Sequence, residues 1–125
     1  NSVLLNMLGE SGLKYECSSF IPFDSGIKLK PWTHVNKTII MSPHFWEDNI
    51  YFSSGLNKEA GIYLQGDGLK VFDFHPIHIF LNTESKERYD ECKKYSSDFR
   101  KLSTFKNFRK YGTRDFLTEL IRMVK

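Results

Sequence analysis

The chain has 125 residues, the size of about one domain, and its 40% hydrophobic and 15% aromatic content suits a packed core. A net charge of +3 does not by itself indicate a nucleic-acid partner. No apolar stretch reaches the roughly 18 residues of a membrane span, and no signal-peptide pattern opens the chain. We therefore expect a cytoplasmic protein with no membrane partner.

The first half of the chain predicts one helix and two strands. Residues 3–8 have a helical apolar face, and residues 13–17 alternate like a short strand. Residues 18–31 contain two prolines and no steady period, so they are predicted to be a long loop. Residues 38–41 form a second predicted strand, and residues 50–56 are aromatic and then turn-like.

The second half predicts a third strand and two helices. An apolar, β-prone run predicts a strand over residues 69–81, whereas residues 59–67 have no assignment. One helix is predicted to begin near Ser85, and the last near Thr113, because both residues suit an N-cap. Asp115 would lie in the first turn of the last helix, where a carboxylate complements the helix dipole.

Strands flanked by helices predict an α/β protein that forms a single domain over residues 1–125. Three strands make only a small sheet. We therefore expect a portion of a larger sheet or barrel.

Two histidines follow the apolar run of the third predicted strand. His75 would lie toward the strand's C-terminal end, where α/β proteins place reactive groups, and it can act as an acid, base or ligand near neutral pH. His78 is three positions later, on the opposite face of a regular strand, although Pro76 could bend the chain. One structural and one exposed histidine remains the alternative interpretation.

A second candidate group follows the strand predicted at residues 38–41. Asp48 could orient a histidine and stabilise its protonated form, and Trp46 could form the wall of an active site. The alternative is a solvated Glu47–Asp48 pair beside a core tryptophan. His34 and His44 are expected to be structural or exposed.

The basic segment 100–110 has interleaved phenylalanines and is the part of the chain most like a nucleic-acid-binding surface. It contains no recognised binding motif, so a solvated helix face or loop is the preferred interpretation. Cys17 and Cys92 do not have metal-type spacing and are expected to be reduced.

Three segments together resemble the C-terminal half of polysaccharide deacetylases, the carbohydrate esterases with a NodB-homology domain. They are residues 13–19 (LKYECSS), 39–48 (IIMSPHFWED) and 72–76 (FDFHP). In that family a G-x-x-Y-x-S-S strand, a P-x-x-W-x-D strand and an F-H-P strand follow one another in this order. The resemblance is strongest to the branch that acts in bacterial surface-polysaccharide synthesis.

The resemblance implies a partial (β/α) barrel, the C-terminal portion of a distorted barrel of about seven strands. It also implies metal-dependent removal of N-acetyl groups from amino sugars of a polysaccharide. His75 would be the general acid toward the leaving amine, Asp48 would tune that histidine, and Trp46 would help to wall the acetyl pocket.

The family's Zn²⁺, or other divalent metal, is held by an aspartate and two histidines from motifs that would precede Asn1. No metal ligand is therefore assigned in this chain, which we expect to be a C-terminal fragment that is inactive alone. One alternative is a non-catalytic carbohydrate-binding module that uses Trp32, Trp46 and the tyrosines. The other is a nucleic-acid-binding module that uses residues 100–110.

Overall fold

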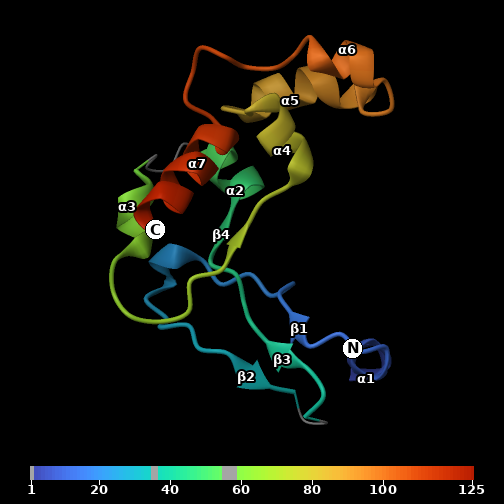
Figure 1. Ribbon diagram of the computed structural model, residues 1–125, viewed down its shortest axis with the longest axis vertical. Coiled ribbons are helices and arrows are strands. Elements are labelled where there is room, and N and C mark those ends of the chain that lie inside the picture. Colours follow the sequence, from blue (N-terminus) through green and yellow to red (C-terminus); the bar gives the residue numbers. More distant parts are fainter. Residues whose placement is uncertain (1, 35–36, 55–58) are drawn as a thin grey trace. The chain divides into compact units, whose positions relative to one another are not determined.

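A computed structural model describes residues 2–34, 37–54 and 59–125 as a mixed α/β protein (Figure 1). The chain divides into two compact units, which are described separately. Unit 1 comprises Asn1–Trp46 and Gly66–Phe72, and unit 2 comprises Glu47–Gln65 and Asp73–Lys125. None of the helices in the described ranges is long and apolar enough to cross a membrane.

The helices and strands are short. In chain order they are α1 (Ser2–Glu10), β1 (Tyr15–Glu16), the 3₁₀ turn η1 (Phe23–Ser25), β2 (Trp32–Thr33), β3 (Ile40–Met41), β4 (Trp46–Glu47), α2 (Asp48–Ser54), α3 (Ala60–Leu64), β5 (Phe72–Asp73), α4 (Pro76–Leu81), α5 (Lys86–Cys92), the 3₁₀ turn η2 (Lys93–Tyr95), α6 (Phe99–Ser103) and α7 (Thr113–Met123). The strands that the structure describes form two small sheets and no closed barrel, so the partial barrel stays a prediction.

Unit 1 contains a three-stranded sheet in the order β1-β3-β2. Strand β1 is parallel to β3, and β2 is antiparallel to it. The strands predicted at residues 13–17 and 38–41 are present in shortened form, and β2 lies just beyond the long loop that was predicted. Phe45, which is 3% exposed, packs edge-on against Phe72 with their ring centroids 4.9 Å apart.

Strand β5 ends at Asp73, so the prediction of a single strand over residues 69–81 is wrong beyond that point. Helix α4 begins at Pro76, with His75 as its N-cap residue in extended conformation. Proline suits the first helical position because its φ is already helical and the N–H it lacks would have no helical partner. The apolar residues between positions 69 and 81 therefore belong to a strand and then to a helix, which repeat their side-chain directions with different periods.

Helix α2 covers residues 50–54 of the segment that was expected to be turn-like, and residues 55–56 lie outside the described ranges. The helix predicted near Ser85 is confirmed as α5, since the Ser85 side chain accepts a hydrogen bond from the Arg88 N–H. Helix α7 begins at Thr113 as predicted, but its N-cap is Gly112, whose N–H donates to Asp115.

The core of unit 2 is built where α4, α5 and α6 pack together. Leu81, Cys92 and Leu102 are at most 4% exposed, and partly buried aromatic residues pack around them. Helix α7 contacts both α3 and α4 through its buried face, which includes Phe116 and Leu120. Burial of this face, more than intrinsic propensity, stabilises helices this short.

Two buried asparagines join the end of α4 to the start of α7. Asn82 has a left-handed backbone (φ 54°), and its side-chain oxygen accepts hydrogen bonds from the N–H groups of Arg114 and Asp115. The Asn107 amide donates to the carbonyls of Asn82 and Lys110. Backbone groups that would otherwise be buried without partners are thereby satisfied.

We expect Gly112→Ala to destabilise the protein by about 1–3 kcal/mol, the usual cost of overpacking. A Cβ atom at Gly112 would collide with the backbone and side-chain oxygens of Asn82. Urea unfolding measures the change.

Gly61→Ala is the matched control, because its Cβ would meet only the flexible Met123 side chain, at 3.6 Å. Since Gly61 lies in α3, the change should be neutral or slightly stabilising. Equal stability of the two variants would contradict the close packing of Gly112 on Asn82.

Candidate functional site

Asp48 is the first residue of α2 and the most buried carboxylate of the candidate site. It is only 1% exposed. A carboxylate at a helix N-terminus is stabilised by the helix dipole and by backbone N–H groups that have no helical partner. The turn from β4 into α2 therefore favours an ionised side chain at a position where burial alone would oppose it.

His75 uses two nitrogens to bind this carboxylate. Its backbone N–H donates to Oδ2 of Asp48 at 2.8 Å, and its ring Nδ1 lies 2.6 Å from Oδ1. A carboxylate can only accept, so Nδ1 carries the proton and Nε2 is the ring nitrogen left for proton exchange with another molecule. The His75 side chain is 39% exposed, which makes such exchange possible.

The pKa values of the pair follow from burial and charge. Burial lowers the pKa of His75, but the hydrogen bond and charge of Asp48, together with the charges of Asp73 and Glu47, outweigh it, so this pKa is raised above its usual 6.5. Burial raises the pKa of Asp48 above its usual 3.8, and the two hydrogen bonds from His75 offset this effect only in part. The imidazolium form of His75 is therefore favoured relative to a solvated histidine.

Asn49 connects His75 to the second histidine of the site. Its Nδ2 lies 3.4 Å from both ring nitrogens of His75. Equal distances to Nδ1 and Nε2 place the amide over the face of the ring, because an in-plane donor would approach one nitrogen. The Asn49 Oδ1 accepts a hydrogen bond of 2.7 Å from Nε2 of His78.

His78 is a buried, neutral residue that supports this arrangement. It is 1% exposed, its Nδ1 lies 3.1 Å from the Thr83 hydroxyl, and the rings of Phe52 and Tyr89 pack edge-on against it. Burial, followed by repulsion from His75, lowers the pKa of His78 to about 4. The ring therefore accepts from Thr83 and donates to Asn49 in one fixed tautomer.

Three residues of the site could be considered as metal ligands. One possible ligand atom from each of Asp48, His75 and His78 lies within 4.8 Å of the other two. Two ligands on a tetrahedral zinc ion lie about 3.3 Å apart, given bonds of about 2.0–2.1 Å. The 2.6 Å between Nδ1 of His75 and Oδ1 of Asp48 is instead a short charge-assisted hydrogen bond. Both nitrogens of His78 are also hydrogen-bonded, so these three residues do not fit a metal centre as they are arranged.

Helix α4 explains how both histidines reach one site. Positions three apart would face opposite sides of a strand, but they share one side of a helix. The ring centroids of His75 and His78 lie 5.6 Å apart. The sequence predicted the pairing of Asp48 with His75, whereas Asn49 and Thr83 were missed. The only sequence signal for Asn49 was its position directly after Asp48.

Trp46 and His44 lie in unit 1 and are buried. Trp46 is 3% exposed and packs against Phe72, with ring centroids 5.8 Å apart. His44 is 4% exposed, and its Nδ1 lies 2.7 Å from the carbonyl oxygen of Cys17. The role of Trp46 in walling an acetyl pocket stays a prediction.

Residues 1–93 match the family model described as WbmS-like polysaccharide deacetylase. A crystal structure of WbmS from Bordetella bronchiseptica, described as a candidate polysaccharide deacetylase involved in O-antigen biosynthesis, is similar at 34% identity and a TM-score of 0.83. The match covers 98% of this chain and 51% of the WbmS chain, so this chain spans about half the length of its relative. No curated protein matches the chain.

Asp48→Asn is expected to lower the pKa of His75, because it removes the charge that stabilises the imidazolium. An NMR titration of the His75 ring measures this change. Asp73→Asn is the control, since Asp73 acts on His75 only through its charge and less strongly than Asp48. An unchanged or raised pKa in Asp48→Asn would contradict the assigned pairing.

The buried His78 predicts a loss of stability in acid. Its pKa is about 4 in the folded chain and 6.5 when solvated, so its contribution is complete above pH 6.5 and declines as the pH falls toward 4. His75, whose pKa is raised, contributes with the opposite sign, since its share is complete below pH 6.5 and is lost as the pH rises through its folded pKa.

Between pH 7 and pH 4.5, we expect the unfolding free energy of the unmodified chain to fall by about 2–3 kcal/mol more than that of His78→Gln. Urea unfolding at each pH provides the comparison. Parallel pH profiles for the two proteins would show that His78 is not held neutral in the folded chain.

Proposed function

Because the chain belongs to the WbmS-like polysaccharide deacetylase family, we propose that it contributes the general-acid half of a deacetylase site. The family acts on acetylated polysaccharides. The proposed reaction is hydrolysis of the N-acetyl groups of amino sugars in a bacterial surface polysaccharide. The observation that carries this proposal is the double hydrogen bond between the buried Asp48 and the partly exposed His75.

His75 is the proposed general acid. Amide hydrolysis releases an amine, which is a poor leaving group unless it gains a proton as the carbon–nitrogen bond breaks. With Nδ1 held by Asp48, the proton on Nε2 of the imidazolium is the one that His75 would deliver to the amine nitrogen. The raised pKa of His75 keeps that proton available closer to neutral pH.

Asp48 is the proposed positioning residue. It fixes the tautomer and the ring orientation of His75 and stabilises the protonated form through its charge, as in other carboxylate–histidine pairs. Asn49 would limit rotation of the same ring by lying over its face. The Asn49 side-chain oxygen accepts a hydrogen bond from Nε2 of His78. His78 would therefore affect catalysis only through Asn49.

A divalent metal in the complete enzyme would supply the Lewis acid and activate the nucleophilic water. Asp48, His75 and His78 do not fit that role, since Oδ1 of Asp48 and Nδ1 of His75 bond to each other and both nitrogens of His78 are hydrogen-bonded. We propose that the metal ligands lie outside these 125 residues. The chain would then be the C-terminal portion of a barrel and inactive alone.

The binding-module alternative is weaker than the deacetylase proposal. It relied on Trp32, Trp46 and the tyrosines, of which Trp46 is buried, whereas Trp32, Tyr15 and Tyr111 are exposed. Exposed aromatic rings alone do not specify a sugar site, whereas the Asp48–His75 pair has a specific chemical use.

The test is a chimera in which this chain follows the half of WbmS that the match does not cover. We expect the chimera to release acetate from an N-acetylated polysaccharide, and the 125-residue chain alone to release none. His75→Gln should lower kcat of the chimera by about 10²–10⁴-fold, the usual contribution of acid–base catalysis. Asp73→Asn, the matched control, should retain most of the activity.

A chimera that folds and is equally active with His75→Gln would contradict the general-acid role. Acetate release by the isolated chain would contradict the proposal that the metal ligands lie elsewhere.

A further inference from the structure

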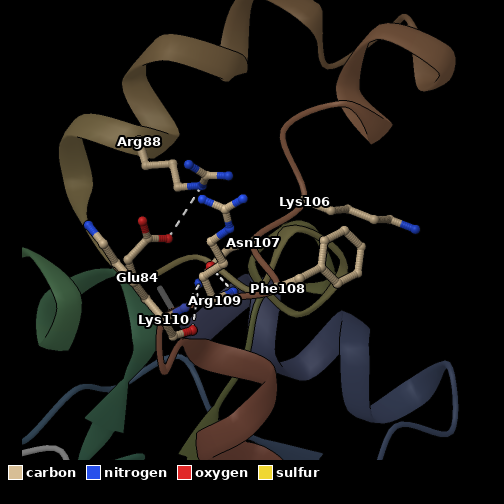
Figure 2. Close-up of a pocket in the computed structure, with 7 residues that line it drawn as sticks. All are labelled: Glu84, Arg88, Lys106, Asn107, Phe108, Arg109 and Lys110. Carbon is tan, nitrogen blue, oxygen red and sulfur yellow. Dashed lines mark hydrogen bonds and ion pairs between the residues drawn. The ribbon is translucent and has the colours of Figure 1, made fainter.

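A pocket of about 310 Å³ lies in unit 2, beside the loop that follows α6 (Figure 2). It is separate from the residues that surround His75. Its lining consists of four cationic side chains, one carboxylate, one amide and one aromatic ring: Arg88, Lys106, Arg109, Lys110, Glu84, Asn107 and Phe108. This excess of positive charge in a concave site is characteristic of an anion-binding pocket.

The single carboxylate of the pocket is already paired. Glu84 lies 3.4 Å from Nε of Arg88, and an Nη of Arg88 also donates to the Phe105 carbonyl at 2.7 Å. Within the described part of the chain, no carboxylate lies at ion-pair distance from Lys106, Arg109 or Lys110. Arg109 and Lys110 therefore line the pocket without a carboxylate partner, whereas the Lys106 ammonium lies 4.1 Å from the centroid of the Phe80 ring.

Two of the cationic side chains of the pocket, those of Arg88 and Arg109, lie close together. Figure 2 shows the Arg109 side chain reaching toward the guanidinium of Arg88, with Lys106 and Phe108 on the other side of the view. Two guanidinium groups that face each other repel unless an anion lies near both. Arginine also matches phosphate and carboxylate oxygens through its fork of N–H donors.

The backbone beneath these cations is firmly held. Asn107 is 5% exposed, and its Oδ1 accepts hydrogen bonds of 3.0 Å from the N–H groups of both Arg109 and Lys110. Its amide donates to the Asn82 carbonyl, which ties the loop to the end of α4. A preorganised loop reduces the entropy lost when a ligand binds.

Phe108 gives the pocket an apolar surface as well. Its ring is 77% exposed, and the guanidinium of Arg114 lies 5.9 Å from the ring centroid. An exposed ring of this size beside cations offers a face on which the C–H side of a sugar ring could pack.

We propose that this pocket binds an anionic sugar. Arg109 and Lys110 bind its phosphate or carboxylate group, with Arg88 and Lys106 adding positive charge, and Phe108 packs against the sugar ring. A neutral sugar lacks the charged group that Arg109 and Lys110 would bind. The proposal concerns binding alone, so it stands or falls independently of deacetylation by His75.

Isothermal titration calorimetry of the 125-residue chain tests it with glucose 1-phosphate, glucuronate and glucose. We expect saturable binding of at least one charged sugar and none of glucose, and the two charged arms distinguish phosphate from carboxylate. Arg109→Gln/Lys110→Gln should weaken binding at least about tenfold, which corresponds to about 1.4 kcal/mol. Both side chains are exposed and the Asn107 bonds use backbone N–H groups, so the variant should fold.

Arg122→Gln/Lys125→Gln is the matched control, since it removes the same charge from exposed positions at the end of the chain. Its affinity should equal that of the unmodified chain. Equal weakening by both variants, or no saturable binding of either charged sugar, would overturn the proposal. Tight binding of a single-stranded oligonucleotide with a steep salt dependence, without sugar binding, would also overturn it in favour of a nucleic-acid surface.

Discussion

The hydrogen-bonded pair of Asp48 and His75 is the constraint on which the candidate site depends. A carboxylate that is 1% exposed must be compensated, because burying an unpaired charge costs several kcal/mol. Two donors from His75 and the N-terminus of α2 provide that compensation. The same bonds assign the Nδ1 proton and leave Nε2 for proton exchange. The stability of the buried carboxylate and the proposed chemistry therefore require the same geometry.

The surroundings of this pair keep the two histidines in different protonation states. His75 is partly exposed and beside a carboxylate, which raises its pKa, whereas His78 is buried among aromatic rings and is held neutral. Two adjacent imidazolium groups would repel, and the neutral state of His78 avoids this. One histidine can therefore exchange protons while the other serves as a fixed hydrogen-bonding partner.

The sequence predicted α1, α5 and the start of α7, because caps and periodicity are local signals, and the family resemblance predicted the approach of Asp48 to His75. It failed at residues 69–81, where apolar residues serve a strand and then a helix, and no pattern marks the change except Pro76. Asn49 was missed for another reason, since the motif of residues 39–48 ends just before it and its contacts with His75 and His78 cross 26 to 29 positions of sequence.

Helix α4 has only six residues, too few to be stable in isolation. His75 precedes its first turn, His78 lies within it, and Asn82 ends it in a left-handed conformation. Asn82 is in turn bonded to Asp115 and to the carbonyl of Asn107, so the loop before α7 supports the helix that presents His75. The position of the proposed acid therefore depends on Asn107 and Asp115, which lie 25 and 33 positions after Asn82.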